Sequence, residues 1–243
     1  MRILLIDAGN SRVKWAMVEG ETWLREGTLL HRDMPTLGAE FSGLPSPDRI
    51  LVSNVAGDVM AQLLGAACAI WRCQVEFIVA RVAECGVRNL YECPAQLGCD
   101  RWATLIAAWD RVRAPCLVVN CGTATTIDTL SLTGEFLGGL ILPGLSMLEA
   151  SLTAGAAQLG QIEGGAWYRF PRNTADAILS GAIQATVGAV RLQFEAMAQA
   201  GDCHCVLSGG GADSLQSYLE LPVIRVDNLV LRGLQIIGSQ KID

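Results

Sequence analysis

The start of the chain alternates between apolar and polar positions in a way that predicts three short strands. Arg2–Ile6 is a buried run, Arg12–Val18 alternates between two faces, and Thr22–Leu30 can form the third strand. The turns Gly9-Asn10 and Glu19-Gly20 that separate them are short. Short turns between alternating segments favour antiparallel hairpins.

After residue 48 the pattern changes to buried runs that alternate with helical segments. Apolar residues recur at three- and four-residue spacing between Asp100 and Val112, which predicts an amphipathic helix there. The other elements expected in this part are strands at Arg49–Ser53 and Val75–Val79, a helix at Val59–Trp71 and a loop at Cys93–Gly98.

The same order of elements begins again after Ala114-Pro115. The strands expected there are Cys116–Asn120, Ala124–Leu130, Phe136–Leu142, Cys203–Leu207 and Val223–Val226. The helices expected there are Leu145–Ala154, Thr174–Ala200, Ala212–Leu219 and Leu229–Ile237. Strands that alternate with helices in this way predict an α/β protein.

Two segments of the chain match each other in character. Ile6-Asp7-Ala8-Gly9-Asn10 and Val119-Asn120-Cys121-Gly122-Thr123 both consist of a buried strand end, a polar residue, a small residue, a glycine and a polar turn. Two unrelated strand-turn units could give the same short match, because such turns are common. The repeated order of elements favours a duplication, with halves at 1–113 and 114–243 and a cleft that both turns face.

Composition narrows the class of protein. Hydrophobic residues make up 51% and charged residues 17%, which excludes a disordered chain. The mean hydropathy is +0.36, but no charge-free stretch reaches the roughly 18 apolar residues that span a bilayer. The net charge of −6 argues against binding nucleic acid. With no signal peptide in the pattern, we expect a cytoplasmic protein that binds no membrane.

The nine cysteines have an odd count, which together with the lack of a secretion signal predicts free thiols. Cys203-His204-Cys205 has two of the residue types that bind zinc. No second pair lies at the spacing of a zinc site, so an ordinary strand is the better interpretation.

The first turn, Asp7–Lys14, has the chemistry of a phosphate cradle. Gly9 allows a tight turn whose amides can point at an anion, and Lys14 adds a positive charge. Asp7 at the strand end can hold Mg²⁺, with water completing its coordination. A plain hairpin with an Asx turn is the alternative.

Two further glycine-containing turns have similar chemistry. Gly122 and Thr123 could grip phosphate from a second side, whereas Thr125 and Thr126 are explained by β propensity. Gly209 and Gly210 within Ser208–Asp213 would let a flat adenine lie on the backbone, although a flexible strand-to-helix turn is an equal alternative.

Asp100 and Arg101 open the amphipathic helix. Asp100 fits a first-turn or capping acid, and it also fits a general base that takes a proton from a substrate hydroxyl during phosphoryl transfer. Arg101 could bind an acidic substrate through two hydrogen bonds.

Taken together, these segments resemble the type III pantothenate kinases. The segments are DAGNSRVK at 7–14, YECPAQLGCDRW at 91–102, NCGTATTID at 120–128, NTADAILSG at 173–181 and SGGGAD at 208–213, in this order over essentially the whole chain. The resemblance implies two duplicated ribonuclease H-like domains of the actin-like ATPase superfamily. It also implies transfer of phosphate from ATP to pantothenate, the first step of coenzyme A synthesis.

The resemblance also implies roles for individual residues. Asp100 would be the proton acceptor and Arg101 the carboxylate anchor, with Mg²⁺ near Asp7. The residues implied in ATP binding are Asp7, Ala8, Gly9, Asn10, Ser11, Arg12, Val13, Lys14, Thr123, Gly209 and Gly210. Those implied in pantothenate binding are Tyr91, Gly98, Cys99, Asp100, Arg101 and Thr174. Members of the family are homodimers.

The sequence departs from the family at Asn120. The family usually has an aspartate at this position, and that aspartate binds a monovalent cation such as K⁺ or NH₄⁺. Asparagine keeps an oxygen ligand and loses the charge, so we expect weaker or absent dependence on K⁺, or a cation held by other groups.

Two alternative functions stay open at this point. The protein could be another small-molecule kinase with the same fold, or a non-catalytic nucleotide sensor.

Overall fold

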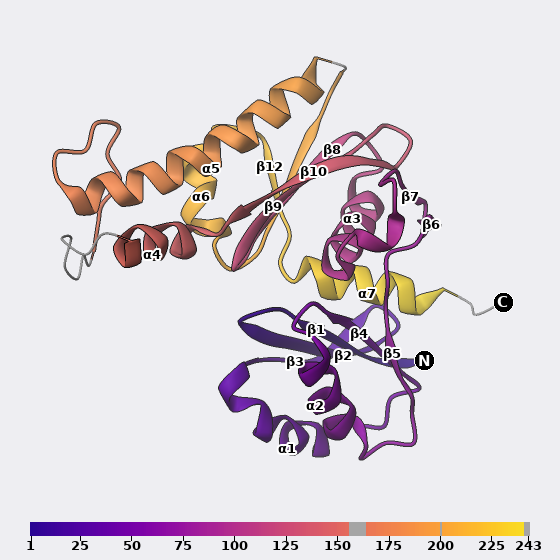
Figure 1. Ribbon diagram of the computed structural model, residues 1–243. Coiled ribbons are helices and arrows are strands. Elements are labelled where there is room, and N and C mark those ends of the chain that lie inside the picture. The colour runs from indigo at the N-terminus through magenta and orange to yellow at the C-terminus, as the bar shows by residue number, and fades with distance from the viewer. Residues whose placement is uncertain (156–163, 200, 241–243) are drawn as a thin grey trace. The chain divides into compact units, whose positions relative to one another are not determined.

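The computed structural model describes residues 1–155, 164–199 and 201–240 (Figure 1). Contacts divide the chain into two compact units. Unit 1 consists of Met1–Arg111, Gly134–Phe136 and Asn228–Asp243, and unit 2 consists of Val112–Thr133 and Leu137–Asp227. Within the described residues, no helix is both long and apolar enough to cross a membrane.

Unit 1 contains a mixed five-stranded sheet with the order β3-β2-β1-β4-β5. The predicted hairpins are confirmed, because β2 pairs antiparallel with both β1 and β3, whereas β4 runs parallel to β1 and β5. The strands are β1 (Arg2–Ala8), β2 (Arg12–Glu19), β3 (Thr22–Leu30), β4 (Arg49–Asn54) and β5 (Val75–Phe77).

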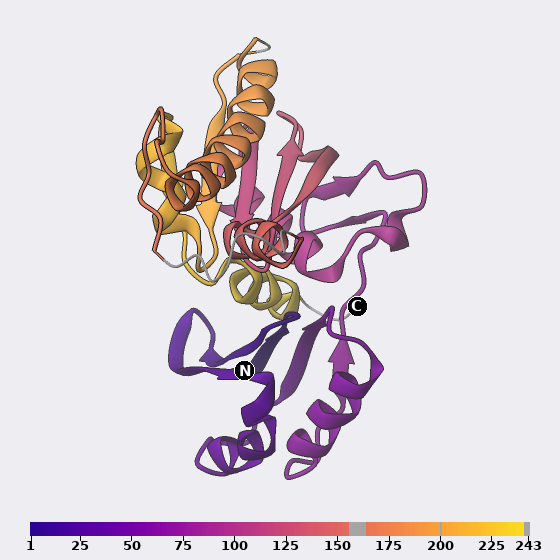
Figure 2. The same cartoon turned by 60° about the vertical axis from the view of Figure 1, so that its left-hand side comes forward.

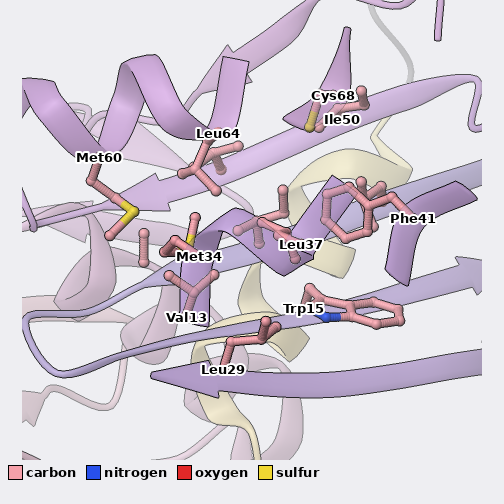
Figure 3. Close-up of a cluster of buried hydrophobic side chains, with 14 of the residues drawn as sticks. Val13, Trp15, Leu29, Met34, Leu37, Phe41, Ile50, Met60, Leu64 and Cys68 are labelled. Atoms are coloured by element: carbon pink, nitrogen blue, oxygen red, sulfur yellow. The ribbon is translucent and has the colours of Figure 1, made fainter. Parts of the chain in front are cut away.

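One face of this sheet packs on α1 (Leu37–Ser42) and α2 (Asp58–Cys68). Trp15 is central to that core, and Figure 3 shows its indole beside Phe41. The two rings meet edge to face with centroids 5.5 Å apart, a favourable geometry for aromatic pairs. Gly27 lies opposite Trp15 on β3, where a Cβ would come within 2.7 Å of the indole.

The other face of the unit 1 sheet packs on α7 (Leu229–Ser239). The helix α3 (Cys99–Val112) crosses α7 closely, since a Cβ on Gly233 would lie 2.0 Å from the Ala103 carbonyl oxygen. Helix backbones can approach this closely only where a glycine leaves room.

Unit 2 repeats the topology of unit 1. Its strand order is β12-β11-β8-β9-β10, in which β8 pairs antiparallel with β9 and parallel with β11. These positions match those of β5-β4-β1-β2-β3, which supports the predicted duplication. The strands are β8 (Cys116–Cys121), β9 (Ala124–Leu130), β10 (Glu135–Pro143), β11 (His204–Ser208) and β12 (Val223–Arg225).

Helices α5 (Thr174–Ala198) and α6 (Ala212–Leu219) cover one face of the unit 2 sheet, and α4 (Leu145–Gly155) packs on α5 (Figure 2). The alternation of α6 with β11 and β12 corresponds to that of α2 with β4 and β5. The last residue of the predicted helix Thr174–Ala200 lies outside the described residues.

The compact units divide the chain differently from the predicted halves 1–113 and 114–243. The first boundary agrees closely, but α7 belongs to unit 1 because it packs on β1, β2 and β4. The halves describe a repeat along the sequence, whereas the units follow packing, so the division into halves stays a prediction.

Several short elements are absent from the sequence-based assignment. They are α1, the hairpin of β6 (Ala83–Glu84) with β7 (Val87–Asn89), and the 3₁₀ turns η1 (His31–Thr36) and η2 (Pro94–Gln96). Strands of two or three residues are too short for alternation to show. The β6–β7 hairpin nevertheless matters, since β7 pairs with Glu135 and Phe136 at the start of β10.

Candidate active site

The first predicted phosphate turn joins β1 to β2 in unit 1. The amide of Gly9 donates to the Arg12 carbonyl at 3.1 Å, which closes the turn and leaves Asn10 and Ser11 exposed at its tip. Asp7 and Lys14 are directly opposite each other in the strand register. The carboxylate and the ammonium therefore lie on one face of the sheet, at the base of the turn.

Not every residue of this turn can offer its side chain to a ligand. Ala8 and Val13 have no exposed surface and pack into the core on the opposite face. If they touch ATP, as the resemblance implies, they can do so only through their backbone. Arg12 is exposed.

Asp7 and Asp100 are brought together although they are far apart in the sequence. Burial, and after it the negative charge of Asp100, raise the pKa of Asp7 from 3.8 to about 7, although the positive charge of Lys14 acts in the opposite direction. A carboxylate at the end of a buried strand, facing a second carboxylate, is a place where a cation is favoured.

Ser53 and Cys99 connect the end of β4 to the beginning of α3. The Ser53 hydroxyl is fully buried and donates to the Cys99 sulfur at 3.4 Å, and that thiol contacts the Asn54 carbonyl at 3.5 Å. Ser53 is also the residue opposite Asp7 in the parallel pairing of β1 with β4. These contacts fix the first turn of α3, and with it Asp100, relative to Asp7.

Arg101 is buried against two aromatic rings. Its guanidinium carbon lies 5.7 Å from the centroid of the Tyr91 ring and 5.6 Å from that of Phe136, and it donates to the Tyr91 hydroxyl at 3.0 Å. Stacking on aromatic faces holds a guanidinium rigidly and fixes the plane in which its N–H groups donate. The structure thus brings the predicted pantothenate residues Tyr91 and Arg101 into contact. Arg101 directly follows the other predicted contacts Gly98, Cys99 and Asp100 in the chain.

Asn89 was not identified from the sequence, yet it shapes this part of the site. Its side-chain Nδ2 donates to the Pro94 carbonyl at 3.1 Å, and its Oδ1 accepts from the backbone amide of Tyr91 at 3.1 Å. The side chain is buried and sets the path of the loop that carries Tyr91. No local pattern distinguishes it from an ordinary strand-end asparagine.

The second turn, in unit 2, has the same construction as the first. The amide of Gly122 donates to the Ala124 carbonyl at 3.0 Å, as Gly9 does to Arg12, and Thr123 is exposed. Gly144 supports the turn from behind, since its amide donates to the Thr123 carbonyl at 2.9 Å and a Cβ there would clash with Gly122.

The glycine segment after β11 packs on this second turn. Gly209 has a φ of +95°, and a Cβ on it would lie 2.2 Å from the Cys121 carbonyl oxygen. The Gly211 amide donates to the same carbonyl at 3.0 Å. Gly210 is exposed with open space beside it. The predicted nucleotide residues Thr123, Gly209 and Gly210 are therefore neighbours within unit 2.

Asn120 lies at the end of β8 and is paired with Thr126 on β9 and with Ser208 on β11. The Thr126 hydroxyl oxygen is buried and makes no hydrogen bond within the part of the chain that the structure describes. Thr174 is the one predicted pantothenate contact that belongs to unit 2 and not to unit 1. It is the exposed first residue of α5 and follows the capping residue Asn173.

Among the described residues, no group of three or more His, Cys, Asp or Glu side chains forms a metal cluster. Cys203-His204-Cys205 runs into β11 as the predicted strand, and all nine thiols are free. The described residues therefore offer no site for a metal ion that takes all its ligands from the protein. Mg²⁺ takes most of its ligands from water and phosphate and needs only one or two carboxylates.

Comparison with known proteins identifies the family. A model of the family described as type III pantothenate kinase matches residues 3–196. A type III pantothenate kinase of Aromatoleum aromaticum is 46% identical over 98% of both chains. This chain belongs to the type III pantothenate kinase family.

A second relative from this kinase family, in Nitrosospira multiformis, is 44% identical over 98% of this chain and 91% of its own. Solved structures agree on the fold. A conserved putative Baf family transcriptional activator from Campylobacter jejuni has a TM-score of 0.61 at 21% identity, covering 97% of this chain and 98% of its own. The ethanolamine utilization protein EutJ from Carboxydothermus hydrogenoformans has a TM-score of 0.55 at 11% identity, covering 98% and 90%. The actin-like fold expected of a type III pantothenate kinase is therefore confirmed.

Proposed function

We propose that this protein phosphorylates pantothenate with ATP to give 4′-phosphopantothenate, the first step of coenzyme A synthesis. The observation that carries the proposal is the pairing of Asp7 with Asp100 beside a turn built to bind phosphate, next to the anchored Arg101. Its family membership supports the same substrate and phosphate donor.

Asp100 acts as the proton acceptor in this proposal. Its Oδ1 accepts from the Arg101 amide at 2.8 Å, which orients the carboxylate at the beginning of α3. The substrate hydroxyl gives its proton to Asp100 as its oxygen bonds to the γ-phosphorus. The bond from that phosphorus to the bridging oxygen breaks, and ADP leaves with the electron pair.

Arg101 provides the site for the carboxylate of pantothenate. Because Tyr91 and Phe136 hold its guanidinium plane, little side-chain entropy is lost on binding. Tyr91, Gly98, Cys99 and Thr174 complete the proposed substrate contacts.

The two turns provide the binding of ATP. The first turn offers backbone amides and Lys14 to the phosphates, and the second offers Thr123, with Gly209 and Gly210 beside the adenosine.

The residues fit a Mg²⁺ ion that accompanies ATP. Asp7 is a hard oxygen donor whose ionised form is disfavoured by burial and by Asp100, so a divalent cation would stabilise that form. When bound, the ion would neutralise the charge that develops on the phosphates. Water molecules and phosphate oxygens would supply its other ligands.

Two uncharged oxygen ligands for a monovalent cation lie on adjacent strands at position 120. Asn120 and the Thr126 hydroxyl offer oxygen atoms from adjacent strands, and the latter makes no hydrogen bond to another described residue. Asp128 is fully buried two residues further along β9. We therefore propose that K⁺ or NH₄⁺ binds weakly here and that activation by these ions is modest.

A homodimer is the proposed assembly. Apolar side chains are exposed along the second half of β10 and the following helix in unit 2, which we call the β10–α4 face: Leu140, Ile141, Met147 and Leu152. Large exposed apolar side chains are typical of protein interfaces when they gather on one surface. A second copy of the chain would remove them from water.

Release of ADP by dialysed protein with Mg²⁺ and ATP, in the presence and absence of pantothenate, tests the function. We expect turnover that depends on pantothenate and that Asp100→Asn reduces by at least about 1,000-fold, while the folding transition stays cooperative. Near-wild-type turnover of Asp100→Asn would remove Asp100 from the mechanism.

The same assay separates the alternatives. A small-molecule kinase with another acceptor would release ADP with a different hydroxy acid and not with pantothenate. A non-catalytic nucleotide sensor would bind ATP without releasing ADP for any acceptor.

A further inference from the structure

The first phosphate turn is held by a residue that lies outside every recognised motif. The Nε2 atom of His31 lies 2.8 Å from the Gly9 carbonyl oxygen, and the side chain is half-buried directly after β3. A carbonyl oxygen can only accept a hydrogen bond, so Nε2 must carry a proton and donate.

This hydrogen bond determines where the turn can bind an anion. The Gly9 carbonyl and the Asn10 amide belong to one planar trans peptide unit, in which C=O and N–H point in opposite directions. Because His31 holds the carbonyl, the Asn10 N–H must point away from the imidazole. The Gly9 amide is already bonded to the Arg12 carbonyl, so the next amide of the turn, that of Asn10, takes its direction from the peptide plane that His31 holds.

Lys14 is held in a similar way at the other end of the turn. Its ammonium donates to Oδ1 of Asn228 at 3.4 Å, and Nδ2 of Asn228 donates to the Glu26 carboxylate at 3.2 Å. The positive lysine and the negative glutamate together require this orientation of the amide. Asn228 has a φ of +53° before the first residue of α7, a conformation that asparagine tolerates better than most residues.

An uncharged partner is well suited to a lysine that must act on phosphate. Asn228 restricts the position of the ammonium without neutralising its charge, whereas a carboxylate at the same place would compete with the phosphate for it. The carboxylate of Asp7 also lies near Lys14, and the proposed Mg²⁺ would bind that carboxylate.

We propose that His31 and Asn228 are positioning residues for phosphoryl transfer, His31 by aiming the turn amide and Asn228 by placing Lys14. The inference rests on the proposed function, because the ligand of the turn is taken to be the phosphate chain of ATP. Neither residue belongs to the segments that carry the family resemblance.

His31 is tested by removing and then restoring its donor. His31→Leu should raise the KM for ATP about five- to ten-fold, the worth of one ordinary hydrogen bond, and leave the KM for pantothenate within two-fold. His31→Gln, whose amide can donate, should recover most of the loss. His204→Leu, at the other histidine of the chain, is the control for removing an imidazole.

Asn228 is tested by a change that keeps its backbone conformation. Asn228→Gly retains the positive φ and removes the side chain, and it should lower kcat about five- to ten-fold. Glu220→Gly is the matched control, since Glu220 has the same φ of +53° at an exposed helix end in unit 2. A shift in melting temperature equal in both variants, with kcat unchanged in Asn228→Gly, would overturn the role of Asn228.

A binding measurement distinguishes failure of this inference from failure of the proposed function. Wild-type protein that releases no ADP with pantothenate would contradict the function. Binding of a non-hydrolysable ATP analogue would still test His31, and we expect His31→Leu to weaken it five- to ten-fold. Wild-type affinity in His31→Leu, or an equal loss in His31→Gln, would overturn the positioning role of His31.

Discussion

At the scale of single residues, the ionised Asp7 side chain lowers the free energy of unfolding of the protein. Its pKa is raised from 3.8 to about 7 in the folded protein by burial and by Asp100. Between these two values the folded protein binds more protons than the unfolded chain, so this group makes unfolding easier as the pH rises from about 4 to 7. Above pH 7 the cost is complete.

Asp7→Asn should therefore stabilise the metal-free protein in a pH-dependent manner. We expect a gain in the free energy of unfolding of about 2–4 kcal/mol at pH 8 and almost none at pH 4, with turnover abolished. Denaturant unfolding of both proteins in EDTA across this pH range measures the difference. Asp202→Asn controls for the loss of one exposed charge, and a gain independent of pH would contradict the explanation.

Asn120 offers the reverse test, in which a charge is added. Asn120→Asp places a carboxylate beside the Thr126 hydroxyl, so it should bind K⁺ more tightly. We expect activation of turnover by K⁺ to grow by at least about three-fold over that of the wild type, with Na⁺ as the comparison salt. Strong activation of the wild-type enzyme by K⁺ would show that other groups, such as Asp128, supply the missing charge.

The sequence predicts which residues carry the chemistry of the site better than it predicts which residues contact them. Asp7 and Lys14 are recognisable because they lie on strands beside a glycine turn, and Asp100 and Arg101 because they lie in the first turn of a helix. His31 and Asn228 are not, since their roles depend on contacts with Gly9 and Lys14 that only the fold creates. Hydrogen bonds between distant segments leave no periodic signal in the sequence.

At the scale of elements, most strands and helices follow from the apolar pattern to within two residues. The helix predicted at Val59–Trp71 is α2, which ends three residues earlier at Cys68, and the strand predicted at Val75–Val79 is β5, which ends at Phe77. Thr22–Leu30, Ala124–Leu130 and Ala212–Leu219 have the predicted bounds. The hairpin of β6 and β7 is not predictable in this way, because Cys85 takes a positive φ at its turn and its strands are too short for a period. The position of α7 beside β1 is likewise a tertiary property.

The crossing of α3 and α7 gives a prediction about stability and activity together. Gly233→Ala would put a methyl group into the Ala103 backbone, and we expect a loss of about 1–3 kcal/mol in the free energy of unfolding. Since α3 carries Asp100, turnover should fall in the fraction that remains folded. Thermal unfolding and ADP release measure the two effects.

Gly65→Ala is the matched control for this substitution. Gly65 lies in α2 of the same unit, with nothing within 4 Å of an added Cβ. Alanine in an open helix position should stabilise the protein by about 0.5–1 kcal/mol. A similar destabilisation by both variants would show that the crossing is not the cause.

At the scale of the whole molecule, the excess of apolar residues is not used up by the cores of the two units. The chain is 51% hydrophobic, and Ile141 of the β10–α4 face is 65% exposed. An isolated exposed residue needs no explanation, but β10 and α4, two consecutive elements of one unit, expose four large apolar side chains.

A single charge on the β10–α4 face should therefore break the proposed dimer. Ile141→Asp would bury a carboxylate among apolar side chains of the second copy, which costs several kcal/mol. We expect sedimentation to show a dimer for the wild type and a monomer for Ile141→Asp at micromolar concentration. Val59→Asp, at a position in unit 1 that is 72% exposed on α2, should remain dimeric. A monomeric wild type would contradict the assembly, and a dimer in both variants would place the interface on another surface.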